Sequence, residues 1–280
     1  MNVTRKQVDL SGPPDEGHVS RVLRTPVTLL ERGKPVVVSR RYGGDLTALH
    51  AAASTVRYPK HAKRTNGLPV KNRSFGFTTR NVIRGDYCSA ASLARANSES
   101  HRALCEFAVE LDQLYREALP EQSESHRFAA LKRIHPDFRL GESLFTSGNA
   151  NRNNAVGYHY DTGNFSGVCS AMIVLRNGAS GGTLILPEFD VGLYLDDGDC
   201  LFFDGQGILH GVTPITLESP ESYRISLVYY TLEQAWQCLP AGGELDRIKR
   251  EKTQREQAIA GKVGYRGGKP EFRKRKDLPR

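Results

Sequence analysis

The sequence predicts an α+β protein with a jelly-roll core and helices that pack against it from the N-terminal side. Two observations carry this prediction. From about residue 142 to residue 235, short apolar runs are separated by Gly- and Asp-containing turns at even spacing, which is typical of a β-sandwich or jelly roll. Before them, residues 98–119 repeat apolar side chains at intervals of three and four, which is typical of an amphipathic helix.

The chain is expected to divide into four parts. Residues 1–20 combine Pro, Gly and mixed charge without periodicity, which predicts a disordered N-terminus. Residues 21–141 predict an N-terminal α/β region. Residues 142–235 predict the jelly-roll core, and residues 236–280 predict a polar, basic C-terminal tail that contains a charged helix.

Two helices are expected ahead of the core. The first spans residues 98–119, with Ser98 or Ser100 as its N-cap and Pro120 after its end. The second is shorter and spans residues 125–134. We expect both helices to cover the sheet and assign them no chemistry.

The strands of the core are expected from short runs of β-branched and aromatic residues that end in turn residues. The polar segment between the first two of these runs, GNANRNNA, is expected to be a loop. The runs are SLFTS, GYHYD, SAMIVLR, TLILPEF, CLFFDG, ILHGVTPI and YRISLVYYT.

Composition indicates a soluble globular protein of 280 residues, enough for a sizeable core. The N-terminus has no apolar run typical of a signal peptide, and no run is long enough for a membrane span. The five Cys form no C-x-x-C pair and are odd in number, so we expect neither a disulfide framework nor a zinc site. The expected location is a reducing cytoplasm, or the host-cell cytoplasm or the nucleus for a viral or eukaryotic source. A monomer is favoured.

The net charge of +8 is unevenly distributed, which suggests a polyanionic partner, with DNA first. The window 46–85 contains no Asp or Glu but eight Lys and Arg, and the tail is also basic. Tyr58, Phe75 and Phe77 lie among these basic residues, as in a groove where aromatic side chains stack on bases. The alternative is that the aromatic residues belong to the core and the charges to a solvated surface.

The segment that begins at His159 carries the chemistry. His159 and Asp161 are two residues apart, so on a β-strand they point to the same side. His210 lies on a later strand candidate. Two imidazoles and one carboxylate form the ligand set that suits ferrous iron and leaves three coordination positions open. The alternative is a pair of ordinary surface or core histidines.

Arg224 and Ser226 follow His210 by about one hairpin and share one face of a strand. An Arg at this position can hold a dicarboxylate cosubstrate through its two-pronged guanidinium group.

Together these residues resemble the double-stranded β-helix core of iron(II)- and 2-oxoglutarate-dependent dioxygenases, and within these the TET and J-binding-protein family of nucleic-acid base oxygenases. The resemblance covers roughly residues 142–232. It implies that His159, Asp161 and His210 bind Fe(II). It also implies that Arg224, assisted by Ser226, binds 2-oxoglutarate, and that O2 is the oxidant.

The resemblance further implies two contacts to the substrate base. Asn164 matches an Asn that contacts the flipped cytosine, and Tyr230 matches an aromatic residue that stacks on it. Gly163 and Leu232 stand where TET proteins carry His residues. Asn164 could instead serve its turn, Tyr230 could belong to the core, and the choice between cytosine and thymine stays open.

The resulting hypothesis is a dioxygenase that oxidises the 5-methyl group of a pyrimidine in DNA, with 5-methylcytosine favoured over thymine. One alternative is a 2-oxoglutarate oxygenase that hydroxylates a small molecule or a protein side chain. The other is a non-catalytic cupin-like DNA-binding protein. For the proximal carboxylate of 2-oxoglutarate, Arg139 and Arg152 are both candidates.

Overall fold

The computed structural model describes residues 1–10, 12–58, 71–79 and 88–262. It forms two compact units, Met1–Cys238 and Leu239–Arg280. The described part of the second unit is dominated by helix α5 (Ala241–Lys262), which agrees with the charged helix expected there. All the other elements belong to the first unit.

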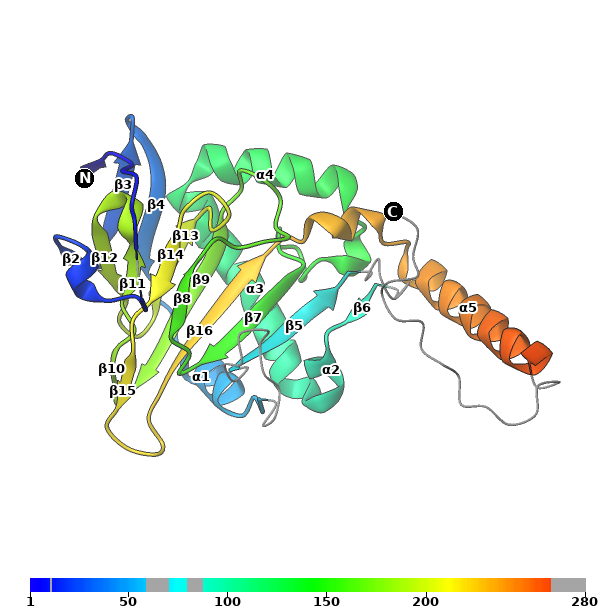
Figure 1. Ribbon diagram of the computed structural model, residues 1–280. Coiled ribbons are helices and arrows are strands. Elements are labelled where there is room, and N and C mark those ends of the chain that lie inside the picture. The colour runs from blue at the N-terminus through cyan, green and yellow to red at the C-terminus, as the bar shows by residue number, and fades with distance from the viewer. Residues whose placement is uncertain (11, 59–70, 80–87, 263–280) are drawn as a thin grey trace. The chain divides into compact units, whose positions relative to one another are not determined.

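The first unit is built on a large mixed sheet and a smaller one (Figure 1). In spatial order the nine strands of the large sheet are β1 (Asn2–Val3), β3 (Val27–Glu31), β4 (Lys34–Arg41), β13 (Asp199–Phe203), β9 (Ser170–Asn177), β16 (Tyr223–Tyr230), β7 (Ser147–Arg152), β5 (Asn72–Thr78) and β6 (Ser89–Ala90). The five strands of the small sheet are β2 (Val22–Arg24), β12 (Val191–Tyr194), β11 (Leu184–Leu186), β14 (His210–Val212) and β8 (Val156–His159). A further pair joins β10 (Ala179–Gly181) to β15 (Ile215–Leu217).

The two sheets pack face to face, as expected for a jelly roll. Their shared apolar core contains Val174 and Leu201 from the large sheet and Leu184 and Leu193 from the small one, all buried. Because side chains alternate along each strand, every second residue of the large sheet points into the space between the sheets. The α+β class and the jelly-roll core predicted from the sequence are confirmed.

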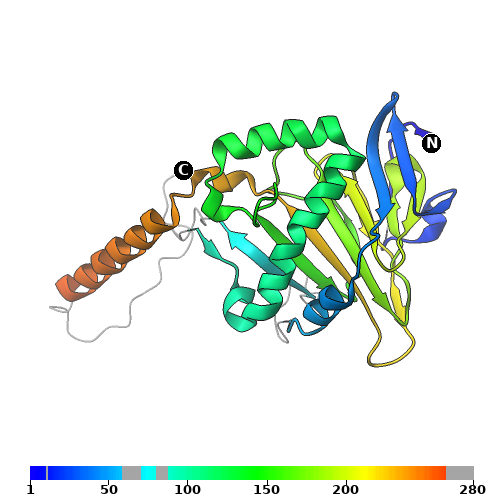
Figure 2. The ribbon, with the colours of Figure 1, turned by 180° about the vertical axis from the view of Figure 1, so that it is seen from behind.

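Helices cover the opposite face of the large sheet, as Figure 2 shows from behind. They are α1 (Thr47–Ser54), α2 (Ser92–Ala96), α3 (Ser98–Ala118) and α4 (Pro120–Arg133). Asn97, one residue before the expected cap, caps α3 by accepting a hydrogen bond from the Ser100 amide at 3.1 Å. Leu104, Leu111 and Tyr115 of α3 are fully buried against the sheet. Short 3₁₀ turns complete the unit: η1 (Glu16–His18), η2 (Pro136–Phe138), η3 (Pro187–Phe189) and η4 (Glu233–Gln237).

The expected disorder of residues 1–20 is wrong. Strand β1 pairs in parallel with β3, and the Met1 ammonium group donates to Thr28 O at 2.7 Å. Further along, His18 Nδ1 and the Tyr158 hydroxyl lie 2.7 Å apart. These contacts are main-chain or single-residue contacts, so they leave no hydrophobic periodicity in the sequence.

The expected boundary near residue 141 does not separate two bodies. β3, β4 and β5 come from the region before it and join strands from the region after it in one sheet. The compact unit ends at Cys238, close to the expected start of the tail at residue 236. Local patterns reveal strands but not the distant strands with which they pair.

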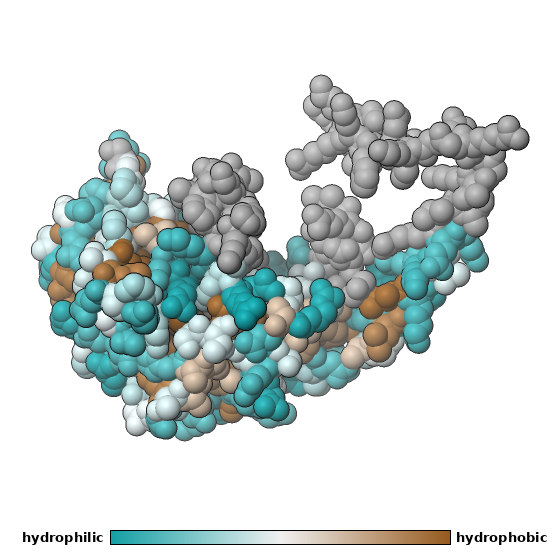
Figure 3. Space-filling model, turned by 90° about the horizontal axis from the view of Figure 1, so that it is seen from below, coloured by the Kyte–Doolittle hydropathy of each residue, from teal (hydrophilic) through white to brown (hydrophobic). Residues whose placement is uncertain are grey.

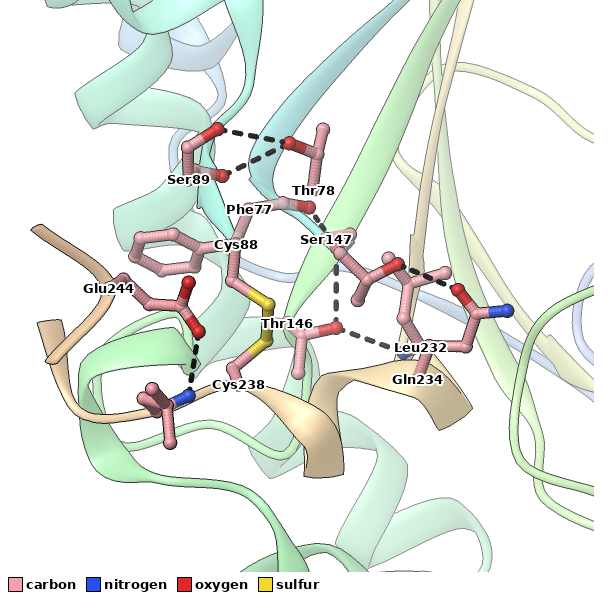
Figure 4. The surroundings of a disulfide bond; sticks show 12 residues. Phe77, Thr78, Cys88, Ser89, Thr146, Ser147, Leu232, Gln234, Cys238 and Glu244 are labelled. Atoms are coloured by element: carbon pink, nitrogen blue, oxygen red, sulfur yellow. Dashed lines mark hydrogen bonds between the residues drawn. A yellow bond between two sulfur atoms is a disulfide. The ribbon is translucent and has the colours of Figure 1, made fainter. Parts of the chain in front are cut away.

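The cysteine count predicted no disulfide framework, and this prediction is also wrong. Cys88 and Cys238 form a disulfide across 150 residues of sequence. Figure 4 shows it beside the turn where Thr146 Oγ1 accepts a hydrogen bond from the Leu232 amide. Such a long separation leaves no spacing signal, because a disulfide depends only on the distance between two residues in the folded chain. Cys105, Cys169 and Cys200 are free thiols.

The aromatic residues of the basic window divide between two environments. Phe75 is fully buried and packs edge to face on Tyr229, so it belongs to the core and cannot stack on a base. Phe77 is half-buried against Phe138. Much of the window, including Lys60, Lys63, Arg64, Arg80 and Arg84, lies outside the described residues.

Among the described residues, no helix combines the length and apolar character needed to cross a membrane. The surface seen in Figure 3 is largely hydrophilic, with apolar side chains in small groups.

Candidate active site

A pocket of about 490 Å³ lies between the two sheets. The inner face of the large sheet supplies alternate residues of β7 and β16, including Asn149, Asn151, Ser226 and Tyr230. The last two strands of the small sheet, β14 and the edge strand β8, supply the two predicted histidines. The pocket is therefore polar on one wall and carries metal-binding side chains on the other.

The three predicted metal ligands come together at this pocket. β8 ends at His159 and β14 begins at His210, and the two residues are direct partners in the antiparallel ladder. Their ring centroids are 4.3 Å apart. Asp161 follows two residues after His159, and its carboxylate lies beside the two imidazoles. One ligand atom from each of the three residues lies within 4.8 Å of the others.

Hydrogen bonds fix the orientation of both imidazoles. His159 Nδ1 donates to Gly157 O and His210 Nδ1 donates to Ile208 O, each at 2.9 Å. A carbonyl oxygen only accepts, so each Nδ1 carries the proton and each Nε2 presents its lone pair. The two Nε2 atoms lie 3.5 Å and 3.7 Å from Asp161 Oδ1. This is the arrangement in which imidazole nitrogens and a carboxylate converge on one cation.

The protonation states also suit a cation. Burial alone raises the pKa of Asp161, but its interactions with the side chains of His159 and His210 outweigh burial and hold the pKa below its usual value. Burial lowers the pKa of His210. The carboxylate is therefore ionised and the imidazole neutral near neutral pH, as metal coordination requires.

Gly205 makes room for the carboxylate. The Gly205 carbonyl accepts a hydrogen bond from the Asp161 amide at 2.8 Å. A Cβ atom at residue 205 would overlap Asp161 Oδ2. Any larger residue would push the carboxylate away from the histidines, so glycine is required here by close approach.

Arg224 lies on β16 and is the largest fully buried side chain of the protein's described residues, 2% exposed. Its Nε and Nη2 atoms are buried without a hydrogen-bond partner among those residues. Burial, together with the neighbouring Arg176, lowers the pKa of Arg224 to about 9. Unpaired donors on a buried cation are costly, and a bound carboxylate would satisfy them.

Gly182 gives the Arg224 side chain its space, since a Cβ there would lie 2.6 Å from Arg224 Cδ. Ser226, two residues on, lines the pocket.

The two predicted base contacts both line the pocket. Asn164 is 4% exposed, and its Oδ1 accepts from the amides of Phe165 and Thr231 while its Nδ2 donates to Ser170 Oγ. Most of its hydrogen-bonding capacity is thus used to hold β16 and the ligand loop together, as the turn interpretation implied. Tyr230 lies near Asp161, and burial raises the pKa of Tyr230 to about 12. Contact of either residue with a base stays a prediction.

Sequence reasoning missed four asparagines that line the pocket: Asn72, Asn149, Asn151 and Asn154. The first five residues of the segment GNANRNNA, 148–152, belong to strand β7 and not to a loop. From this strand Asn149 and Asn151 line the pocket with Asn72 of β5. The signal was present, because Asn at every second position is the period of a strand.

Glu188 supports the segment that leads into His210. It is buried, and its carboxylate accepts a hydrogen bond from the Leu209 amide at 2.8 Å, directly before His210. Neither candidate for the proximal carboxylate, Arg139 or Arg152, lines the pocket.

Comparisons with known proteins agree with this geometry. Residues 74–233, more than half of the chain, match the family model for Tet_JBP, the oxygenase domain of the 2-oxoglutarate and Fe(II)-dependent dioxygenase superfamily. The bifunctional helicase and thymine dioxygenase JBP2 of Trypanosoma brucei brucei is 34% identical over 120 residues, which are 43% of this chain and 11% of that protein. The JBP2 of Trypanosoma cruzi is 30% identical over 144 residues, 51% of this chain and 13% of that protein. The chain thus matches only about an eighth of the length of these curated relatives.

Among solved structures, NgTET1 in complex with 5mC DNA superposes with a TM-score of 0.57 at 13% identity, covering 82% of this chain and 90% of that one. This likeness supports the fold. The family match shows that the chain belongs to the Tet/JBP family of 2-oxoglutarate- and iron(II)-dependent oxygenase domains.

Proposed function

We propose that this chain oxidises the 5-methyl group of a pyrimidine in DNA, with His159, Asp161 and His210 holding Fe(II) and with Arg224 and Ser226 holding 2-oxoglutarate. The observation that carries the proposal is the convergence of the three ligands on a pocket that Ser226 of β16 also lines. Two residues before Ser226 on the same strand stands Arg224, whose buried Nε and Nη2 have no partner among the described residues. The relatives' activity on thymine and the 5mC DNA bound to NgTET1 favour a pyrimidine methyl group as substrate.

The metal and the cosubstrate, when bound, supply the power to insert an oxygen atom from O2 into a C–H bond. The chain's own residues position the reactants. The carbonyls of Gly157 and Ile208 hold the imidazoles in one orientation. Arg224 offers paired N–H donors to a carboxylate, and its burial strengthens that attraction because little water competes.

A pyrimidine in a duplex cannot reach this pocket while it is stacked, so the base has to rotate out of the helix. The pocket volume of about 490 Å³ is sufficient for a single base beside the cosubstrate. Tyr230 offers an aromatic face, and Asn149 and Asn151 offer amides that can donate to or accept from a base edge.

DNA is held electrostatically in this proposal. The described basic residues Arg57, Lys71 and Arg73 belong to the acid-free window, and the basic tail 264–280 lies outside the described residues. Affinity for DNA is therefore expected to fall steeply with salt.

5-Methylcytosine is the proposed base, and thymine is the second candidate because both trypanosomal relatives are thymine dioxygenases. The two bases differ at C4, where cytosine has an amino donor and thymine a carbonyl acceptor. Asparagine amides can pair with either, so the choice depends on how Asn149 and Asn151 are rotated.

Nucleoside mass spectrometry tests the proposal. The protein would be incubated with Fe(II), 2-oxoglutarate, ascorbate and DNA in which either 5-methylcytosine or thymine is the only methylated base, with Asp161→Ala as the control. Gain of one oxygen on one base is the expected result. Succinate formation without a modified nucleoside in either DNA would contradict the proposed substrate but leave the oxygenase assignment intact.

A further inference from the structure

A second cleft, of about 430 Å³, lies away from the active-site pocket. It is formed where the end of α1, the start of β5 and the junction of α2 with α3 meet. The residues that line it are Thr55, Arg57, Tyr58, Arg73, Leu93, Ala96 and Asn97. Two of these are arginines, and none is acidic.

Strand β5 separates the cleft from the active site. Asn72 lines the active-site pocket, while the next residue, Arg73, lines the second cleft. Neighbouring residues of a strand point to opposite faces, so the cleft lies on the helix-covered side of the large sheet. Arg57 and Arg73 thus have no role in holding the metal or the cosubstrate.

Two hydrogen-bond donors in the cleft are buried and unsatisfied. Arg73 Nε and the Tyr58 hydroxyl have no hydrogen-bond partner within the part of the chain that the structure describes. Each buried donor left unpaired costs about 1–3 kcal/mol, so a native protein rarely keeps two of them in one cleft without a ligand to receive them.

The charge of the cleft is also uncompensated. Among the described residues, neither Arg57 nor Arg73 has a carboxylate within 4.0 Å. A third guanidinium group, Arg152 on β7, lies near Tyr58: burial raises the pKa of Tyr58 to about 12, and Arg152 opposes that rise. Tyr58 therefore remains a neutral donor, and the described residues that line the cleft give it a net positive charge without an acidic side chain.

We propose that this cleft is a phosphate-binding site, in which Arg73 and Tyr58 donate to phosphate oxygens from inside and Arg57 donates from the exposed rim. Guanidinium groups match phosphate through paired N–H donors. The N–H and O–H donors of two arginines and a tyrosine outnumber the acceptors of a single carboxylate, which favours a group with more oxygens.

The phosphate could belong to a free phosphorylated compound or to the backbone of DNA. The DNA source rests on the proposed function, whereas the anion site itself does not. An experiment that first uses inorganic phosphate therefore separates the failure of this inference from the failure of the proposed function.

The test compares the full chain with Arg73→Gln and Tyr58→Phe. Arg102→Gln is the matched control, because it removes the same charge from an exposed position on α3. Thermal unfolding is followed while sodium chloride is replaced by sodium phosphate at constant ionic strength. Phosphate is expected to raise the Tm of the wild type and of Arg102→Gln saturably, as a ligand of the folded state does.

Arg73→Gln and Tyr58→Phe are each expected to weaken phosphate binding at least tenfold. Arg73→Gln should be at least as stable as the wild type without phosphate, since it removes a half-buried guanidinium group whose buried Nε has no partner among the described residues. With phosphate it should be less stable than the wild type. A purely structural Arg73 would instead lower the Tm under both conditions and leave the phosphate-induced shift unchanged. That result, or a wild-type Tm insensitive to phosphate, would overturn the proposal.

A second arm identifies the source of the phosphate. Fluorescence anisotropy with a labelled duplex measures DNA affinity for the same variants. If the site holds the DNA backbone, Arg73→Gln weakens DNA binding about tenfold relative to Arg102→Gln, and phosphate competes with DNA. If a free phosphorylated compound is the ligand, DNA affinity is equal in the two variants while phosphate binding still differs.

Discussion

The two faces of strand β16 are opposite in character although their residues alternate along a single strand. The face toward the pocket carries Arg224, Ser226, Val228 and Tyr230. The face toward the helices carries Tyr223, Ile225, Leu227 and Tyr229. The pocket face holds the buried polar side chains of Arg224 and Ser226, which are costly to bury. The helix face buries apolar surface against α3.

This difference shows how the protein tolerates a buried, unpaired guanidinium group. Ile225 and Leu227 are fully buried, and the Tyr229 hydroxyl donates to Leu104 O of α3 at 2.8 Å. The helix-facing side fixes the strand, so that the pocket-facing side can hold polar groups in place before any ligand arrives. Substitutions on the two faces should therefore separate into effects on activity and effects on stability.

The largest effect is expected at the metal ligands. Asp161→Ala removes the carboxylate that both imidazoles approach, and we expect turnover to fall by more than about 100-fold with little change in unfolding temperature. Iron binding measured after anaerobic reconstitution and DNA binding measured by anisotropy would check this. Asp196→Ala, which removes an exposed carboxylate, is the control. Loss of DNA binding together with turnover would show that Asp161 is structural.

Leu227→Ala tests the helix-facing side of β16. Deleting a fully buried Leu side chain should lower the free energy of unfolding by about 2–5 kcal/mol, measured by denaturant titration. The 2-oxoglutarate half-saturation of the remaining folded enzyme should not change. Val228→Ala, on the pocket face and only half-buried, should cost less stability. Equal stability losses at the two positions would remove the distinction between the faces.

Arg224→Ala tests the pocket-facing side. Hydrogen bonds to charged groups contribute about 1.5–3 kcal/mol, so the 2-oxoglutarate half-saturation should rise about 10- to 150-fold. Stability without cosubstrate should be retained or increased, because a buried unpaired cation is removed. Arg224→Lys keeps the charge without the two-pronged geometry and should recover only part of the affinity. An unchanged half-saturation would refute the assignment.

The smallest effect is expected at Ser226. Ser226→Ala removes one neutral hydroxyl, which contributes about 0.5–1.5 kcal/mol, so the 2-oxoglutarate half-saturation should rise by roughly two- to tenfold. Titration of succinate formation against 2-oxoglutarate measures it, with Ser222→Ala, a buried serine outside the pocket lining, as control. A rise as large as that of Arg224→Ala would mean that Ser226 is more than an assisting group.

Part of the candidate site was predictable because its signals are local. A spacing of two residues places His159 and Asp161 on one side, and the same rule relates Arg224 to Ser226. Strand alternation likewise revealed the strands that follow residue 170. Asn149 and Asn151 were misassigned to a loop because asparagine is rare in strands, although their spacing was that of a strand.

The remainder of the fold depends on contacts between distant residues. The pairing of β4 with β13 joins residues about 160 apart, and no property of either strand specifies its partner. Gly205 could be recognised as necessary only once the chain had brought it against Asp161. Partners of this kind are decided by the three-dimensional arrangement as a whole.

The link between Cys88 and Cys238 determines where the chain can be cut. A fragment that stopped at residue 235, the end of the jelly roll expected from the sequence, would lose Cys238 and leave Cys88 as an unpaired thiol. It would also give up the crosslink over 150 residues, which in the loop-entropy account stabilises the folded form by about 5 kcal/mol. The shortest fragment suited to separate expression therefore ends after Cys238, and it requires conditions in which that thiol can be oxidised.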